Sequence, residues 1–593
     1  MTEQSKLLYS TQSNDWGSVL MDRIIASDVA EFAKSHALDD LPENKQFEHF
    51  TSYITVRRHH ARTFDTDDIV VGGNSEPSID SIAIIVNGTL VTEPSTIDEL
   101  IERNGYLEVN FVFGQADRGS HFDSSKMGTF GYGVEDFFRD EPTLPRGERV
   151  RLAAEIKDAI FDQGNKLRKK PTCRLYYATT GRWNEDQIPV ARRDATVTAI
   201  ESTQLFSSID YHCYGSNELH DLYVRTKTAV TREFEFKERR SMPKPDGVKS
   251  AYIGYAPAAE FMKIISDDSG DDILGSIFDE NVRDWQDYNA VNKEMRDTLQ
   301  SPHRDRFALM NNGVTIITSR IGGAGDDLIL ENFQVVNGCQ TSNVLFNERH
   351  EDLSKVFVPL RLIETEDEAV KQAIITATNR QTELTTEQLY ALTDFSRQLE
   401  DTFKTYDEPV RLYYERRDGQ YDRFPEINKT KIVVPRALVT AFAAMFLNDP
   451  TRVTRNYKTI RTKVGAEIFA KGHHIEPYYV AAYAAYRLAF LLRNKLKGDT
   501  GARFHILTAL RYLLDSRPLP PMNRNEIKSR CEEMTKLLWD HAKSDELFAE
   551  ASSIVHKVVE DQGLEFDRDN IRTEATTKGL LQHFGIRVAD DRA

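Results

Sequence analysis

Apolar and polar residues alternate along residues 21–190 with two different periods, which predicts helices and strands in alternation. Residues 21–61 have the three- and four-residue apolar spacing of a helix. Apolar runs typical of buried strands follow, and Asn87-Gly88 directly after the first run is a strong hairpin signal. The predicted strands are 79–86, 106–116 and 173–181, and the predicted helices between them are 95–104, 132–139 and 147–169. This order indicates an α/β domain.

A second segment with both periods begins after the charged run 234–247, and a purely helical pattern follows it. The predicted strands in this segment are 251–257, 312–321, 331–338 and 356–364, and the predicted helices are 258–265, 341–348 and 366–378. From residue 432 onward the amphipathic runs, among them 464–470, have the helical period. The sequence therefore predicts an α/β protein with a disordered N-terminus at 1–20, a first α/β domain at 21–190, a connecting region at 191–248, a central α/β domain at 249–430 and an all-helical C-terminal domain at 431–593.

The charge of the chain limits its partners. With 593 residues it is too long for one hydrophobic core, and 93 Asp and Glu against 76 Lys and Arg give a formal net charge of −17. The surface as a whole repels nucleic acid and anionic membranes, so any nucleic-acid site must be a local basic patch. The most apolar stretch, Tyr478 to Leu492, is shorter than the ~20 residues of a membrane span and contains Arg487. We expect no membrane contact.

The four cysteines lie far apart in the sequence, without a CxxC pair, at Cys173, Cys213, Cys339 and Cys531. This spacing excludes a disulfide scaffold and a zinc ribbon and is typical of a reducing compartment. The polar N-terminal residues lack the layout of a signal peptide. A cytoplasmic location is therefore expected.

Three polar residues of the first domain have the arrangement of a metal-dependent nuclease site. Glu48 falls on a helix, Asp80 opens a strand, and Gln115 lies near the end of the next strand. Hard cations such as Mg²⁺ take carboxylate and carbonyl oxygens held by rigid strands, with water completing the shell. Such sites usually add a lysine two residues after the second ligand, but Asp117 stands there in this chain. The alternative is that Asp80 merely caps a strand and Glu48 is a surface acid.

Three amide-rich turns in the central domain form a second candidate site, for a phosphate or another anion. A strand, a glycine turn and a helix in succession present backbone N–H groups and the positive end of the helix. The alternative is that Asn-Gly pairs are simply good turns. The candidate ligand-binding residues are Asn311, Asn312, Asn337, Gly338, Gln340, Thr341, Asn379, Arg380 and Gln381, and we expect Gln340 and Thr341 to be free to reach the ligand.

A run of cations without an acid lies at the start of the helical domain. Arg452, Arg455, Lys458 and Arg461 recur every three residues, which places them along one stripe of a helix. In a chain of net charge −17 this stripe is a candidate for sequence-independent contacts with the phosphates of DNA or RNA. The alternative is a solvated face that pairs with acids elsewhere in the chain.

Seven segments between Ala251 and Tyr421 together resemble the AIPR family, named for abortive infection and phage resistance. They are NVRDWQ (281–286), NKEMRDTL (292–299), RFALMNNGVTII (306–317), FQVVNGCQTSNVLF (333–346), VPLRLIETED (358–367), ATNRQTELTTEQL (377–389) and RLYYERRDGQY (411–421). The resemblance implies a role in anti-phage defence. The order of turn, helix, strand and helix also looks like the ParB/sulfiredoxin-type fold, which cradles phosphate, although Cys339-Gln340-Thr341 replaces its usual arginine.

The N-terminal domain resembles the restriction-endonuclease-like, or PD-(D/E)xK, module often attached to AIPR proteins. Its landmarks here are Glu48, Gly72-Gly73 before Asp80, and a strand end that reads Gln115-Ala116-Asp117 in place of Gln-x-Lys. The resemblance implies that Asp80 and Gln115 hold Mg²⁺ and that Glu48 supports the site. Lys126, nine residues after Asp117, replaces the missing lysine if the loop folds back.

Two functions follow from these patterns. The first is an anti-phage nuclease that cleaves DNA or RNA with Mg²⁺ at Asp80, Gln115, Glu48 and Lys126. The second is a regulator whose nuclease-like domain is inactive and which binds a nucleic acid, a nucleotide or a phage component. Asp117 favours the second function and the resemblance favours the first. Either function is compatible with a homo-oligomer.

Overall fold

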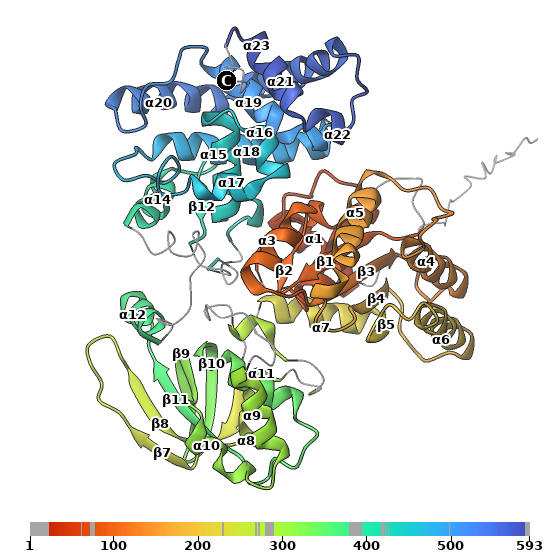
Figure 1. The fold of residues 1–593 in the computed structure, drawn as a ribbon, viewed down its shortest axis with the longest axis vertical. Helices are drawn as coiled ribbons and strands as arrows, with labels where there is room; N and C mark the ends of the chain where they lie inside the picture. The colour runs from red at the N-terminus through yellow and green to blue at the C-terminus, as the bar shows by residue number, and fades with distance from the viewer. Residues whose placement is uncertain are drawn as a thin grey trace, which may run out of the picture.

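The computed structural model describes residues 23–586 except 61, 72–77, 228–230, 267–269, 271–272, 279–289, 379–393, 417–419, 422–423, 425 and 497. Its chain forms an N-terminal α/β unit, a central α/β unit and a helical C-terminal unit (Figure 1). This mixed α/β organisation with a helical C-terminal region is the one that the sequence predicts.

The N-terminal unit has a five-stranded sheet in the order β2-β1-β3-β4-β5. The strands are β1 (Ser81–Val86), β2 (Thr89–Leu90), β3 (Val109–Asp117), β4 (Thr172–Thr179) and β5 (Ser208–Tyr214). Strands β1 and β3 are antiparallel, whereas β3, β4 and β5 are parallel. The β1–β2 hairpin turns at Asn87 and Gly88, which both have positive φ, so the Asn-Gly prediction is confirmed.

Helices cover both faces of this sheet, as the wholly buried strand β1 requires. One face packs against α1 (Arg23–Ser35), α2 (Glu43–Arg57) and α7 (Ser216–Lys227), and the other against α3 (Ser95–Asn104), α4 (Ser124–Phe137), α5 (Glu148–Asp162) and α6 (Gln187–Glu201). Helix α4 begins eight residues before the predicted start because the Asp123 side chain caps it, accepting hydrogen bonds from the N–H groups of Ser125 and Lys126.

The predicted connecting region, 191–248, is wrong as a connector. Its first part supplies most of α6 together with β5 and α7, which complete the N-terminal sheet and its helical cover. Its second part supplies β6 (Thr231–Glu235) and β7 (Glu238–Ser241), the two outer strands of the next sheet. Edge strands such as β6 and β7 are short and half exposed, so their apolar pattern in the sequence is weak.

The central unit has a six-stranded sheet in the order β6-β10-β9-β11-β8-β7. Its other strands are β8 (Ser250–Pro257), β9 (Val314–Ala324), β10 (Asp327–Asn337) and β11 (Phe357–Glu364). One face packs against α8 (Ala258–Ile265), α9 (Ala290–Gln300) and α11 (Cys339–Asn347), which form the core of the unit. Helix α12 (Glu368–Thr378) packs on the opposite face, where Ile375 meets Ile317 and Val336.

The C-terminal unit begins near residue 394, earlier than the predicted 431, because Leu399 and Phe403 belong to its core. Its helices are α14 (Asp394–Thr405), α15 (Pro435–Phe446), α16 (Pro450–Arg455), α17 (Tyr457–Thr462), α18 (Glu476–Asn494), α19 (Arg503–Leu514), α20 (Asn525–Trp539), α21 (His541–Asp561), α22 (Arg568–Ile571) and α23 (Glu574–His583). It also contains a short parallel pair, β12 (Tyr413–Tyr414) with β13 (Ile432–Val433), and turns where a helix was predicted at 464–470. Within the described ranges no helix has the length and apolar character needed to cross a membrane.

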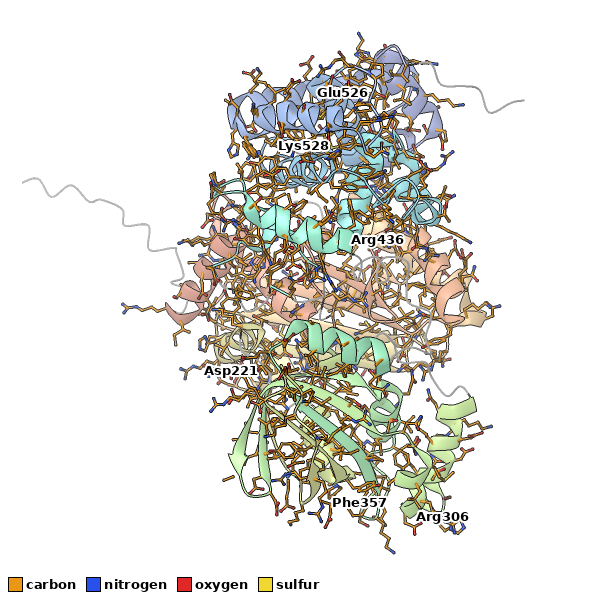
Figure 2. The ribbon with its side chains drawn as sticks, turned by 90° about the vertical axis from the view of Figure 1, so that its left-hand side faces the viewer. Asp221, Arg306, Phe357, Arg436, Glu526 and Lys528 are labelled. Carbon is orange, nitrogen blue, oxygen red and sulfur yellow. The ribbon has the colours of Figure 1, made fainter. Side chains whose placement is uncertain are left out.

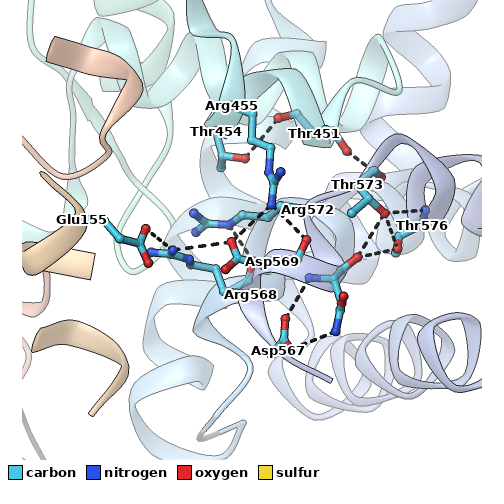
Figure 3. Close-up of polar contacts among 12 residues, drawn as sticks. Glu155, Thr451, Thr454, Arg455, Asp567, Arg568, Asp569, Arg572, Thr573 and Thr576 are labelled. Atoms are coloured by element: carbon cyan, nitrogen blue, oxygen red, sulfur yellow. Dashed lines mark hydrogen bonds and ion pairs between the residues drawn. The ribbon is translucent and has the colours of Figure 1, made fainter. Parts of the chain in front are cut away.

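Ion pairs join the N-terminal unit to the C-terminal unit, and their acids come from the former and their bases from the latter. The pairs are Arg493 with Asp67, Arg572 with Glu93, Arg436 with Glu99, Lys458 with Glu102, Arg503 with Asp68 and Arg568 with Glu155. Figure 3 shows Arg568 reaching Glu155 across this interface. Arg493 and Arg572 are the most buried of these bases, with side chains 8% and 9% exposed. The interface therefore depends on charge complementarity.

We predict that Arg493→Met destabilises the interface strongly. Arg493 donates to Asp67 at 2.6 Å and lies 3.7 Å from Asp65, so its removal leaves two carboxylates close together without their cation. The expected loss is about 3–5 kcal/mol, the usual cost of removing one partner from a buried ion pair. Chemical unfolding measures this loss, and Arg493→Met/Asp67→Asn should recover part of it.

The matched control is Arg320→Met. Arg320 also pairs with an acid, Glu331 at 3.3 Å, but its side chain is 68% exposed. Exposed pairs contribute only about 0–1 kcal/mol. Equal losses in the two variants would contradict the interface assignment.

Candidate metal and nucleic-acid site

Asp80 and Gln115 meet at one end of the N-terminal sheet, as the sequence predicts. The β1–β3 pairing of Ser81 with Gly114 brings the preceding Asp80 beside Gln115. Gln115 Nε2 and the backbone N–H of Ala116 both donate to Asp80 Oδ2, each at 2.7 Å. Asp80 Oδ1 accepts no hydrogen bond from the described residues. The two predicted metal ligands are thus held together by rigid, adjacent strands.

The carboxyl group of Asp80 is harder to ionise than an ordinary aspartate. Burial raises its pKa to about 7, and the nearby charges of Glu48 and Asp117 act in the same direction. The N–H of Ala116 and the ammonium of Lys45 oppose this shift. A bound cation would offset the repulsion among these carboxylates, so the electrostatics of the site favour a positive ligand.

Glu48 approaches this site from α2, on the helix where the sequence places it. Lys45, one turn earlier, pairs with Glu48 at 2.6 Å, and the Glu48 side chain is only 12% exposed. Sequence reasoning missed Lys45, although its i,i+3 spacing from Glu48 on a helix is a visible signal. Glu48 is therefore not a solvated surface acid but part of a charged cluster around Asp80.

Lys126 folds back to Asp117, as the replacement hypothesis requires. Its ammonium lies 2.8 Å from Asp117 Oδ1, where it is held by the first turn of α4. Asp117 also accepts hydrogen bonds from the Gly119 N–H at 3.1 Å and from the Tyr177 hydroxyl at 2.9 Å. Burial raises the pKa of Asp117, but these hydrogen bonds outweigh it and lower the pKa below its usual value. Tyr177 is a partner that sequence reasoning missed.

The oxygens present fit a loosely held Mg²⁺. This ion usually keeps several waters and takes one or two carboxylates from the protein. Gln115 Oε1 is buried without a hydrogen-bond partner, which leaves an acceptor to be satisfied, and a half turn of the amide would direct it toward Asp80. Among the described residues no group of three or more His, Cys, Asp or Glu side chains forms a metal cluster. The residues fit a cation held by Asp80 and Gln115 with water, not an all-protein cage.

The structure brings two of the three predicted amide-rich turns of the central unit together. A Cβ atom on Gly338 would lie 2.8 Å from Val314 Cγ2 and 3.0 Å from the Gly313 carbonyl oxygen, so the two Asn-Gly turns are in contact. Both glycines have positive φ. Asn337 Nδ2 also donates to the carbonyl of Thr378, the last residue of α12, at 2.7 Å.

The side chains predicted to reach a ligand there are mostly used inside the protein, which corrects that expectation. Gln340 accepts a hydrogen bond from Asn292 Nδ2 at 2.6 Å, and Thr341 is buried against Met295. Asn311 Nδ2 donates to the Phe307 carbonyl, whereas Asn312 is exposed. Asn379, Arg380 and Gln381 lie outside the described residues.

The cations from Arg452 to Arg461 do not form one helical stripe. The helix is interrupted at Asn456, so Arg452 and Arg455 lie on α16, whereas Lys458 and Arg461 lie on α17. Three of the four have acidic partners: Arg452 pairs with Asp449 and Glu574, Arg455 with Asp569 and Lys458 with Glu102. Figure 3 shows the Arg455–Asp569 contact. These pairs favour the alternative of internal charge pairing, and nucleic-acid binding by these cations stays a prediction.

We predict that Asp80→Asn is more stable than the wild type at neutral pH. The pKa of Asp80 is about 7 in the folded protein, against an ordinary 3.8, so the carboxyl stays protonated to a higher pH in the folded state than in the unfolded state. Wild-type stability then falls as pH rises from about 4 to about 7 and levels off above that range, whereas the neutral amide has no such dependence. The free energy of unfolding of the variant exceeds that of the wild type by at most about 4 kcal/mol. Melting temperatures between pH 5 and 8 measure it.

Asp117→Asn is the matched control with the opposite sign. The pKa of Asp117 is lowered in the folded protein, so its charge stabilises the native state at neutral pH. The control should lower the melting temperature at pH 7. A pH-independent difference between Asp80→Asn and the wild type would contradict the assignment of a raised pKa to Asp80.

We also predict that Lys458→Glu weakens the interface and that a charge swap restores it. Lys458 pairs with Glu102 at 2.6 Å, and both side chains are about half exposed, so the expected loss is about 1 kcal/mol. Lys458→Glu/Glu102→Lys should recover most of the melting temperature. If the stripe binds nucleic acid instead, the single variant loses affinity at low salt and the swap does not restore it.

Comparison with known proteins bears on the central and C-terminal units. The family model described as AIPR protein matches residues 278–563. No curated protein and no solved structure matches the chain. The match extends past Tyr421, where the predicted resemblance ends, as far as the residues after α21. The restriction-endonuclease-like and ParB/sulfiredoxin-like assignments stay predictions. Residues 278–563 are thus similar to the AIPR family, in agreement with the segments read from the sequence.

Proposed function

We propose that this protein acts in anti-phage defence and that its N-terminal unit cleaves nucleic acid with Mg²⁺. The name of the matched family suggests abortive infection of phage-infected cells. The observation that carries the nuclease assignment is the contact between Asp80 and Gln115, combined with the unpaired, buried Gln115 Oε1. Two oxygens on adjacent strands with a raised carboxyl pKa suit a divalent cation better than a purely structural role.

The residues of the chain divide the work of the proposed site. Asp80 and Gln115 hold the cation, and Glu48 raises the negative potential that attracts it. When bound, Mg²⁺ polarises a phosphodiester and lowers the pKa of its bound water. Lys126 supplies an ammonium group near the end of β3, where its charge stabilises the developing negative charge of the phosphate. Asp117 positions Lys126, and the Tyr177 hydroxyl and Gly119 N–H fix Asp117 in turn.

Binding without cleavage is the second candidate function. The contact between Lys126 and Asp117 at 2.8 Å favours it, because a neutralised ammonium attracts phosphate less than a free one does. In that case the N-terminal unit binds nucleic acid or another ligand as a sensor. The two functions differ in whether the wild-type protein breaks phosphodiester bonds.

We predict that the purified protein cleaves DNA or RNA with Mg²⁺ or Mn²⁺ and not with EDTA. Asp80→Asn should abolish cleavage while the protein stays folded, because an amide cannot supply the ligand charge. Lys126→Met should slow cleavage on the order of a hundredfold, the scale for losing one group that stabilises transition-state charge. Gel assays on plasmid DNA and on RNA measure both effects, and plaque counts with wild-type and Asp80→Asn genes test the link to defence.

Lys263→Met is the matched control for Lys126. Both lysine side chains are 56% exposed and pair with an acid, Lys126 with Asp117 at 2.8 Å and Lys263 with Glu260 at 2.7 Å. The control should cleave at the wild-type rate. A wild type without metal-dependent cleavage, together with an Asp117→Lys variant that cleaves, would replace the nuclease assignment by the sensor function.

A further inference from the structure

Among the residues that the structure describes, α12 is the helix packed on one face of the central sheet, and the rest of that face exposes apolar side chains. Its core face is the one covered by α8, α9 and α11, whereas α12 lies across the opposite face. Figure 2 shows α12 in front of this sheet and the strands continuing below it to Phe357. We call the surface formed by Ile253, Tyr255, Phe357, Pro359 and Arg361 the open face.

Strand register places these residues in two rows on one face. Pro359 pairs with Tyr255 across the β11–β8 ladder, and Arg361 pairs with Ile253. The intervening residues Val358, Leu360 and Leu362 point into the core, where they are buried. Because side chains alternate along a strand, the open-face residues share the opposite side. Ile253, Tyr255 and Phe357 are 44%, 49% and 40% exposed.

Arg361 is the unusual residue of the open face. Its Nε atom is buried without a hydrogen-bond partner, and no hydrogen bond or ion pair joins Arg361 to the described residues. It lies between Ile253 on one neighbouring strand and Thr315 on the other. In a chain of net charge −17, a cation in the middle of a sheet with no acid partner among the described residues points to an anionic ligand.

The predicted amide-rich turns border the open face. Asn337 on β10 and Arg361 on β11 both pair with Thr315 on the strand between them, β9. The Gly313 turn packs directly against Pro359, because a Cβ atom on Gly313 would collide with the Pro359 carbonyl. Arg240 on the edge strand β7 pairs with Ile253 and is exposed. The open face thus combines two exposed aromatic rings with Arg361 on the inner strand β11 and Arg240 on the edge strand β7.

We propose that the open face binds single-stranded nucleic acid. Tyr255 and Phe357 offer flat rings on which bases stack, and Arg361 and Arg240 contact the phosphates between them. Sheets that bind single-stranded RNA use the same combination of exposed aromatic rings and cations. The inference goes beyond the proposed cleavage and does not depend on it, because the open face belongs to another unit than Asp80.

The arrangement favours single strands over duplexes and over protein partners. The bases of a duplex are already stacked on one another, so exposed rings on a sheet contribute little to duplex binding. A purely apolar protein partner would bury Arg361 without satisfying its charge, which is costly. Glu238, opposite Tyr255 at the sheet edge, is the acid nearest in register, and it should weaken the binding of an anion.

Fluorescence anisotropy with labelled dT and U dodecamers tests this proposal on the full chain in EDTA, where metal-dependent cleavage cannot occur. Tyr255→Ala and Phe357→Ala should each lower affinity between about fivefold and a hundredfold. Arg361→Gln should lower affinity and reduce the slope of log K against log salt by about 0.7. Tyr255→Trp should retain binding, and Glu238→Gln should strengthen it. These two results would show that substitutions on the open face do not lower affinity merely by misfolding the protein.

Tyr132→Ala is the matched control. Tyr132 is 40% exposed, close to the 49% of Tyr255 and the 40% of Phe357, but it lies on α4 in the N-terminal unit. This variant should bind like the wild type, and measuring binding in EDTA separates this proposal from the metal-dependent nuclease assignment. Wild-type protein that binds no dodecamer at low salt would overturn the proposal. Binding that survives all three open-face substitutions would also overturn it, as would self-association that the same substitutions abolish in the absence of oligonucleotide binding.

Discussion

The pairing of Ser81 with Gly114 sets the geometry on which the N-terminal site depends. A Cβ atom on Gly114 would lie 2.4 Å from the Ser81 hydroxyl oxygen, so a larger residue at position 114 would force the Ser81 side chain to rotate away. The pairing lets the Asp80 N–H donate to the Gly114 carbonyl at 2.8 Å and brings the Asp80 carboxylate to Gln115. A register shift by one residue would direct Asp80 and Gln115 to opposite faces of the sheet and separate them.

Charge complementarity between units has a comparable role at a larger scale. The acids of the N-terminal unit that face α15 to α22 would repel one another without the bases of the C-terminal unit. Asp67 illustrates this repulsion, because burial and the neighbouring Asp65 raise its pKa to about 6 despite the contact with Arg493. The helical unit therefore does more than pack against the N-terminal unit. It neutralises acids of the N-terminal unit, beside which it lies in Figure 1.

Sequence periodicity predicted most of the fold because buried elements carry strong patterns. Helix α8 was predicted at its observed bounds, and the strands of both sheets were found within a few residues except at the edges. Edge strands β6 and β7 were missed because half-exposed strands lack a continuous apolar run. The start of α4 was misplaced because its signal is a single cap, Asp123, before a polar first turn. The periodic pattern of apolar residues reflects which side chains are buried, so elements with few buried side chains have a weak pattern.

The candidate sites were predictable only where local rules determine the contact. The Asp80–Gln115 contact follows from the two strands, and the return of Lys126 to Asp117 follows from a short loop into a capped helix. The acid partners of Arg455 and Lys458 come from residues 569 and 102, more than a hundred positions away in each case, so no local pattern could reveal them. Long-range pairing of this kind decides whether a cluster of cations is available to a ligand.

This distinction determines how basic residues should be weighed in an acidic protein. Density of cations along the sequence favoured the Arg452–Arg461 run, yet most of those cations are paired with acids in the folded chain. Arg361 has no cationic cluster around it in the sequence, but folding places it beside exposed rings without an acidic partner among the described residues. A partly buried cation without a partner is already partly desolvated in the folded protein, so it loses little more hydration when an anion binds and forms a strong charge-assisted contact. The absence of a partner in the fold is thus a better indicator of an anion site than the number of neighbouring cations in the sequence.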